Sequence, residues 1–203
     1  MKRIPVGVSA RHVHLSRRDC DALFGAGYEL AKRRAVTQPG QYVTRETVDV
    51  IGPKGELRGV GVINPLRAET QIELARTDAI HIGLAPPLRI SGNLAGTPGV
   101  TLRGPRGEVV IDHGAIIAGR HVHMSPADAA ELGVKQGDAI RVEVGGEREA
   151  VLGSVIVRVD PSFTLDLHLD TDEANGLGLD SNSTVGFAGI ELSSRHGDGS
   201  PDR

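Results

Sequence analysis

The hydrophobic pattern along the chain is that of many short β-strands. Apolar and polar positions alternate over short runs rich in valine and isoleucine, which is the period of a half-buried strand. Turns rich in glycine and proline, such as Gly52–Gly55 and Gly104–Gly107, separate the runs. The predicted strands are Ile4–Ser9, Thr47–Ile51, Leu57–Ile63, Leu88–Ser91, Val100–Arg103, Glu108–Asp112, Ala139–Val144, Leu152–Val159 and Thr164–Leu169.

Two short helices are predicted where a serine is followed three residues later by an aspartate, a variant of the capping box. The first runs through Asp21–Phe24 and the second through Ala129–Leu132. A glycine is expected to end each helix. The capping pairs and terminal glycines are Ser16 and Asp19 with Gly25 or Gly27, and Ser125 and Asp128 with Gly133.

An internal repeat organises these elements. The segment Arg11–Ser16 returns almost unchanged as Arg120–Ser125, and each copy reads as strand, His-x-His, capped helix and glycine. The elements predict a mainly β fold of two small β-barrels with short capping α-helices. We expect one half-repeat in residues 1–115 and another in residues 116–190, followed by a polar tail in residues 191–203 that contains His196, which is not expected to bind metal.

Composition excludes several classes of function. The net charge is −3 and there is no tryptophan, which argues against nucleic-acid binding. No apolar run approaches the ~20 residues of a transmembrane helix, and no signal peptide is recognisable, so a soluble intracellular protein is expected. Cys20 is the single cysteine, which excludes an intramolecular disulfide, and it is predicted to pack as a small apolar residue.

The His-x-His pairs are the strongest chemical signal. Side chains two residues apart on a strand point to the same side, so each pair can hold one divalent metal ion. Downstream of each pair, a ligand-type side chain precedes a Thr-Asp pair. Three protein ligands with an open position are typical of a catalytic zinc site. The predicted ligand groups are His12, His14 and Glu73, and His121, His123 and His168.

Other candidate residues are weaker. Arg67 follows a strand in a proline turn, where its guanidinium either binds phosphate or lies in solvent, and the residues alone leave both open. The loop Gly92–Gly99 lacks Gly-Lys-Ser/Thr and a following helix, so it is predicted to be a turn. His81 and His113 have no counterpart in the repeat and are expected to form local hydrogen bonds. The chain contains no G-x-S-x-G motif, so the sequence gives no support for covalent catalysis by a serine.

In matching order from about residue 4 to residue 189, the chain resembles the PduL-type phosphate propanoyltransferases. The motifs that carry the resemblance are Val6–Ser16, Gln38–Tyr42, Arg67–Glu73, Ser91–Gly99, Ala118–Ser125 and Asp172–Asn175.

The resemblance implies a phosphotransacylase, which converts acyl-CoA and phosphate reversibly into acyl phosphate and CoA. Propanoyl or acetyl is the expected acyl group. Two zinc ions per chain are implied at the two ligand groups, and Arg67 is implied as the catalytic, phosphate-binding residue. The CoA contacts implied by the resemblance are Val8, Ser9, Ala10, Lys54 and Asn175.

The resemblance also implies an architecture and a location. The two barrels exchange strands, so the N-terminal strand in residues 4–10 joins the second barrel, and the protein is a homodimer. Members that act in bacterial microcompartments carry an amphipathic segment before the Val6–Ser9 strand, where this chain has five residues. The expected location is the cytoplasm, or a microcompartment lumen with the shell as partner if an N-terminal extension exists.

For the mechanism, we expect phosphate to attack the thioester directly, without a covalent acyl-enzyme. The metal held by His12, His14 and Glu73 lies nearer Ser9 and is predicted to bind the CoA sulfur. The other metal is predicted to polarise the acyl carbonyl or hold phosphate. Two other classes stay open: a dinuclear metal hydrolase of a thioester or phosphoester, and a non-catalytic β-barrel module with structural metal clips.

Overall fold

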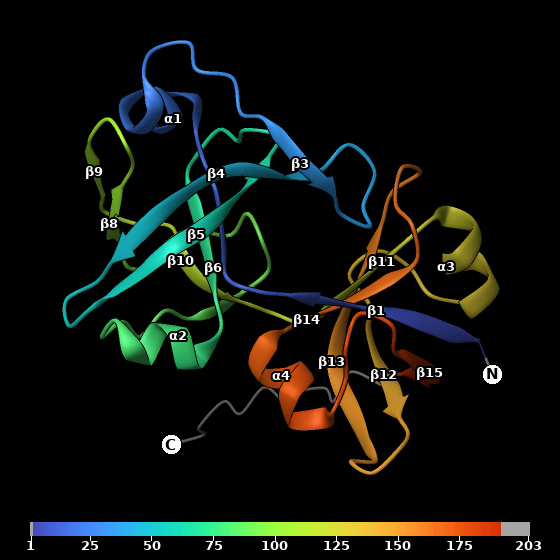
Figure 1. The fold of residues 1–203 in the computed structure, drawn as a ribbon. Coiled ribbons are helices and arrows are strands. Elements are labelled where there is room, and N and C mark those ends of the chain that lie inside the picture. The colour runs from blue at the N-terminus through green and yellow to red at the C-terminus, as the bar shows by residue number, and fades with distance from the viewer. Residues whose placement is uncertain (1, 192–203) are drawn as a thin grey trace, which may run out of the picture.

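The chain forms two β-sheets with separate hydrophobic cores in the computed structural model, which describes residues 2–191. One sheet closes into a barrel with the strand order β1-β14-β11-β13-β12-β15, and it lies beside the second sheet (Figure 1). The barrel strands are β1 (Arg3–Ser9), β11 (His121–Met124), β12 (Ala139–Val144), β13 (Ala150–Val159), β14 (Asp166–Asp170) and β15 (Thr184–Ile190).

The second sheet is nine-stranded and open, so it forms a half-barrel rather than a closed one. Its main path runs β7-β10-β6-β2-β5-β4-β8-β9, and β3 pairs with β4. The predicted mainly β architecture is confirmed, with one barrel closed and the other opened out. The strands of the open sheet are β2 (His12–His14), β3 (Lys32–Ala35), β4 (Tyr42–Ile51), β5 (Glu56–Asn64), β6 (Gln71–Leu74), β7 (Leu88–Arg89), β8 (Val100–Arg103), β9 (Glu108–Ile111) and β10 (Ala115–Ala118).

The helices are short and lie at the outside of the two sheets, as Figure 1 shows. The two predicted from capping signals are present, whereas α2 and α4 were not predicted. Within residues 2–191, no helix is long and apolar enough to span a membrane. The helices are α1 (Arg17–Phe24), α2 (Arg76–His81), α3 (Pro126–Leu132) and α4 (Thr171–Leu177).

Capping explains where α1 and α3 begin. Ser125 and Asp128 form a complete capping box at α3. At α1 the N–H of Ser16 and the carboxylate of Asp19 do not bond directly, but are linked by a relay through Thr70. The backbone N–H of Ser16 donates to Thr70 Oγ1 at 2.9 Å, and that hydroxyl donates to Asp19 at 2.5 Å. The relay fixes the start of α1 to the segment that follows Arg67. Cys20 is fully buried in the core of the open sheet, as predicted.

An exchange of strands joins the two sheets. β1 belongs to the barrel, where it runs parallel to β14, and the chain then enters the open sheet as β2. In the same way β10 runs parallel to β6 in the open sheet, and the chain then enters the barrel as β11. The short connections Ala10–Arg11 and Gly119–Arg120 therefore carry the chain from one sheet to the other immediately before each His-x-His pair.

Several elements differ from the sequence-based prediction. β4 starts at Tyr42 instead of Thr47, and the strands β3, β6, β10 and β15 were missed. β15 contains Gly186 and Gly189, and glycine has low strand propensity, so pairing on both sides by β1 and β12 decides its conformation. The division of the chain into domains near residue 115 stays a prediction. The expected tail, including His196, lies outside the described residues, which end at residue 191.

A contact between the two halves caps α2. Its own N-cap residue, Ala75, has no capping side chain, and the backbone N–H of Thr77 donates instead to the Asp172 carboxylate of α4 at 2.8 Å. We expect Asp172→Ala to lower the free energy of unfolding by about 1 kcal/mol, as the loss of a cap does. Chemical denaturation measures this change, and Asp172→Asn, which keeps an acceptor oxygen, serves as the control. Equal stability of all three proteins would contradict the assignment.

Candidate functional site

The first predicted ligand group assembles at the centre of the open sheet. His12 and His14 lie two residues apart on β2, and Glu73 on β6 is the direct cross-strand partner of His12. All three side chains therefore lie on one face of the sheet. The two Nε2 atoms are 3.2 Å apart, and Glu73 Oε2 is 3.6 Å from His12 Nε2. One ligand atom from each side chain lies within 4.8 Å of the others.

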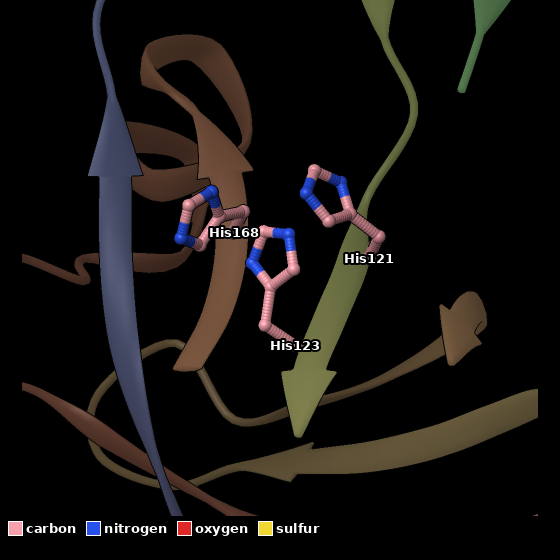
Figure 2. A group of neighbouring side chains, drawn as sticks. All are labelled: His121, His123 and His168. Carbon is pink, nitrogen blue, oxygen red and sulfur yellow. The ribbon is translucent and has the colours of Figure 1, made fainter. Parts of the chain in front are cut away.

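The second group repeats this arrangement in the barrel. His121 and His123 lie on β11, and His168 on β14 is the direct cross-strand partner of His121. The three rings converge from these two strands, as Figure 2 shows. One ligand atom from each ring again lies within 4.8 Å of the others. Register thus gives Glu73 and His168 the same place in the two halves, as the repeat predicts.

Burial favours the neutral form of two of the histidines, which is the form that binds a metal ion. Burial lowers the pKa of His14 to about 3 and that of His123 to about 2, with neighbouring histidines adding to the effect. Both imidazoles are therefore neutral at pH 7. Nδ1 of His12 and of His121 each donates to a backbone carbonyl, of Ala10 and Gly119, at 2.9 Å. Since a carbonyl only accepts, these bonds leave the lone pair of Nε2 free for a ligand.

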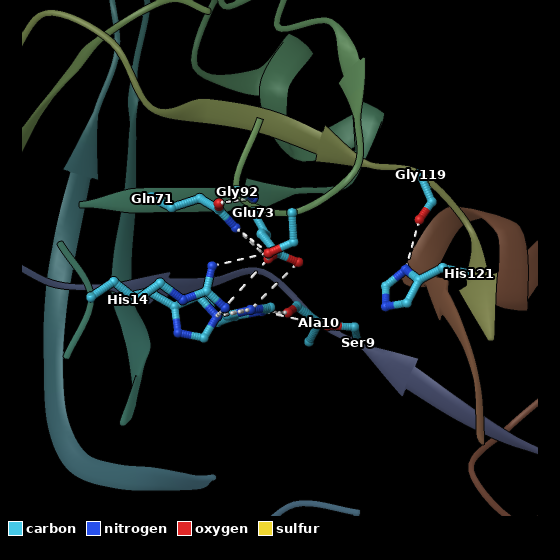
Figure 3. A network of polar contacts seen from close by, with 11 residues as sticks. Ser9, Ala10, His14, Gln71, Glu73, Gly92, Gly119 and His121 are labelled. Carbon is cyan, nitrogen blue, oxygen red and sulfur yellow. Dashed lines mark hydrogen bonds and ion pairs between the residues drawn. The ribbon is translucent and has the colours of Figure 1, made fainter. Parts of the chain in front are cut away.

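The Glu73 carboxylate is held charged by its surroundings. Burial raises the pKa of Glu73, but the neighbouring His12, His14 and Arg67 outweigh it, so that the pKa lies below its usual range. Gln71 Nε2 and Ser91 Oγ donate to Glu73 Oε1 at 2.6 and 3.0 Å. The network is centred on Glu73, with His121 and its Gly119 bond to one side (Figure 3). A buried anion with two histidines beside it is a suitable donor set for a divalent cation.

Both ligand groups line one cleft between the sheets, with a volume of about 560 Å³. A smaller cavity of about 20 Å³ is lined by residues of both crossovers, Ser9, Ala10, Ala118 and Gly119, together with ligands of both groups. The strand exchange is the cause of this proximity, because it brings the starts of β2 and β11 to the same place. The cleft can therefore present two metal positions to one substrate.

Arg67 lies at the first ligand group. Its Nη1 donates to Ser91 Oγ at 2.9 Å, and its Nη2 lies 2.9 Å from His14 Nε2. Burial lowers the pKa of Arg67 from its very high ordinary value, which leaves the guanidinium charged at pH 7. Arg67 lines the cleft. An anion bound by this guanidinium would lie directly beside the metal ligands.

A salt bridge supports each ligand group in the same way. Arg11 precedes His12 and bonds Asp78 of α2 at 3.0 Å, and Arg120 precedes His121 and bonds Glu173 of α4 at 2.7 Å. Each arginine thus ties the crossover to the helix that follows the third ligand. Arg11 and Arg120, the arginines of the two repeated motifs, therefore help to hold the ligand residues in position.

The residues expected to contact CoA fall into two sets. Val8, Ser9 and Ala10 line the cleft beside both ligand groups. Lys54 and Asn175 are exposed and are not among the residues that line this cleft. The structure thus brings the first three together with the ligands and leaves the other two apart. All five CoA contacts stay predictions.

The remaining sequence candidates lie elsewhere. His113 bonds Asp112 and Glu69, as expected of a histidine with local partners. His81 is exposed at the end of α2, and within residues 2–191 its side chain forms no hydrogen bond. The loop Gly92–Gly99 contains neither helix nor strand, in line with the predicted turn, but its first residue, Gly92, donates from its backbone N–H to Gln71 at 2.8 Å.

Sequence reasoning missed several polar residues around the ligands. Asp166 Oδ2 accepts from His168 Nε2 at 3.0 Å, and Gln71 donates to Glu73. Each lies two residues before the third ligand of its half, so the repeat itself carried a signal for both. Ser91 and Arg158 also line the cleft, and neither was predicted as a site residue.

Comparison with known proteins gives a consistent result. A family model described as phosphate propanoyltransferase matches residues 5–180. A protein named phosphate propanoyltransferase from Rhodopseudomonas palustris is 50% identical over 183 residues, covering 90% of this chain and 81% of its own length. One of the same name from Thermotoga maritima is also 50% identical over 183 residues, covering 90% and 87%. One from Salmonella typhimurium is 48% identical over 179 residues, covering 88% and 85%. This chain therefore belongs to the phosphate propanoyltransferase family.

Proposed function

We propose that this protein is a phosphate acyltransferase that transfers a short acyl group, propanoyl or acetyl, reversibly between CoA and inorganic phosphate, with two zinc ions per chain. The observation that carries the proposal is that two three-ligand groups and the Arg67 guanidinium line one cleft. Family membership supports the same reaction class.

The donor sets fit zinc. One group offers two imidazoles and a carboxylate, and the other offers three imidazoles. Both are sets of three protein ligands, which leave a coordination position for substrate. When bound, the metal ions would supply positive charge that favours the CoA thiolate and stabilises negative charge on the acyl oxygen. We propose the group of His12, His14 and Glu73, next to Ser9, as the one nearer the CoA sulfur.

Arg67 positions the second substrate. Its planar guanidinium binds phosphate through two N–H groups, which aims a phosphate oxygen at the thioester carbonyl carbon. The new C–O bond forms as the C–S bond breaks, so that CoA leaves as a thiolate and acyl phosphate is the product. Ser91 Oγ already accepts from Arg67 and Gln71 and donates to Glu73, which supports direct attack by phosphate over a serine nucleophile.

The test is release of free thiol from propanoyl-CoA by the metal-loaded protein, with and without phosphate. We expect release to require phosphate and to yield propanoyl phosphate in equal amount. Release without phosphate would show a hydrolase instead. Absence of release, with unfolding on chelation and no acyl-CoA binding, would show a non-catalytic module with metal clips. An acyl-enzyme trapped by rapid quench without phosphate would contradict direct attack.

Ser91 provides a further prediction. Ser91→Ala removes the hydrogen bonds that hold Arg67 and bridge it to Glu73. We expect the KM for phosphate to rise about 3- to 10-fold, the effect of losing one hydrogen bond, with unchanged metal content. Steady-state kinetics and elemental analysis measure the two quantities. Ser162→Ala, at an exposed turn where the hydroxyl bonds Asp160, is the control. A normal phosphate KM in the Ser91 variant would contradict this role.

A further inference from the structure

Arg158 is the arginine that lines the cleft from the barrel side. Arg158 lies on β13, which runs parallel to β11, and it pairs with His123 in register. Paired residues on parallel neighbours point to the same face, so Arg158 lies on the face of the second ligand group. It lines the cleft together with Arg67, which comes from the open sheet.

An aromatic ring holds the guanidinium of Arg158. Its Cζ lies 5.9 Å from the centroid of the Phe163 ring, and the same ring packs edge-on against His123 at 4.4 Å between centroids. A cation–π contact with a ring face orients a guanidinium while leaving its N–H groups available. Phe163 thus sets the position of Arg158 relative to a predicted metal ligand.

Arg158 has no direct polar partner among the described residues. Within residues 2–191 its side chain forms no hydrogen bond and no ion pair, although it is partly buried. Arg67 is positively charged and lines the same cleft from the open sheet. Two like charges facing one cleft repel each other, and an anion between them removes this cost.

The repeat shows that the fold does not require an arginine at this place. In the open sheet, β5 runs parallel to β2 with Val13 paired to Val62, so the position that corresponds to Arg158 is Ile63. Ile63 also lines the cleft. At this position the open sheet therefore presents an apolar side chain and the barrel presents a cation, so the repeated fold does not by itself account for the guanidinium of Arg158.

We propose that Arg158 binds the attacking phosphate together with Arg67, so that the anion is held between one guanidinium from each sheet. This inference rests on the proposed phosphate acyltransferase activity. The wild-type protein must first show phosphate-dependent thiol release, and failure there counts against the proposed function rather than against the role of Arg158.

The kinetic test compares Arg158→Ala with Arg158→Lys. We expect the alanine variant to raise the KM for phosphate roughly 10- to 100-fold, because a charged hydrogen-bond partner is lost, while the KM for propanoyl-CoA stays within about twofold. Lysine, which keeps the charge without the planar fork, should give an intermediate value. An unchanged phosphate KM, or a rise in the KM for propanoyl-CoA alone, would overturn the proposal.

A second measurement does not depend on the folding of a variant. Phenylglyoxal labels arginines of the wild-type protein, and mass spectrometry of peptides locates the labels. Inorganic phosphate should protect Arg158 as well as Arg67, and it should leave Arg58, whose side chain is 81% exposed, fully reactive. Protection of Arg67 without protection of Arg158 would show that phosphate is bound by one arginine only.

Discussion

Replacement of His12 by alanine is expected to remove one metal ion per chain and to lower activity by at least about 1,000-fold, because two ligands rarely retain a catalytic zinc ion. His12 contributes Nε2 to the group with His14 and Glu73, and its ring is fixed by the bond to Ala10. Elemental analysis and the thiol-release assay measure the two losses on the same preparation. Metal and activity should fall together.

A matched histidine provides the control for this experiment. His113→Ala changes a histidine that bonds Asp112 and Glu69 outside both ligand groups, so it should keep both metal ions and near-normal rates. The corresponding variant in the barrel, His121→Ala, should lose the other metal ion. If His12→Ala retained its full metal content and its activity stayed within a few-fold, the ligand assignment would be wrong.

Arg67→Ala is expected to have the second-largest effect, and of a different kind. The variant should keep both metal ions but lose roughly 100- to 1,000-fold in kcat/KM for phosphate, because the group that binds and orients the anion is removed. Arg67→Lys should recover only part of the loss, since a point charge cannot make the two parallel bonds of a guanidinium. Varying phosphate at saturating propanoyl-CoA measures this quantity.

The control for Arg67 is an arginine of similar chemistry outside the cleft. Arg58→Ala, at a side chain that is 81% exposed, should leave the phosphate dependence unchanged. If Arg67→Ala lost metal as well as phosphate binding, Arg67 would instead be needed to hold the ligand group together. Its contact with His14 Nε2 is the physical basis for that outcome. An unchanged phosphate KM would exclude it from phosphate binding.

Local sequence signals predicted a large part of the fold. The bounds of β8 and β12 agree with the prediction residue for residue, since apolar and polar residues alternate in both strands and clear turns flank them. The starts of α1 and α3 follow from their capping serines. By contrast α2 carries no local capping signal, because its cap comes from Asp172, far along the chain. A signal of that kind is invisible before the two halves meet.

The candidate site divides in the same way. The strand period places His12 with His14 and His121 with His123 on one face each, and the repeat matches Glu73 to His168. These relations need only the alternation of side chains along a strand and the comparison of two similar segments. The partners of Arg67 could not be inferred like this, because Ser91 lies in a loop whose path depends on the open sheet.

By itself the sequence determined the mainly β class, the helices α1 and α3 and the family resemblance, and it predicted the two ligand groups, since each depends on residues close together in the chain or on the order of motifs along it. Only the tertiary structure decided that both groups share one cleft, that one sheet closes while the other stays open, and that Arg158 and Arg67 line the same cleft. The physical reason is the exchange of β1 and β10 between the sheets, a choice of long-range backbone pairing that no local pattern encodes.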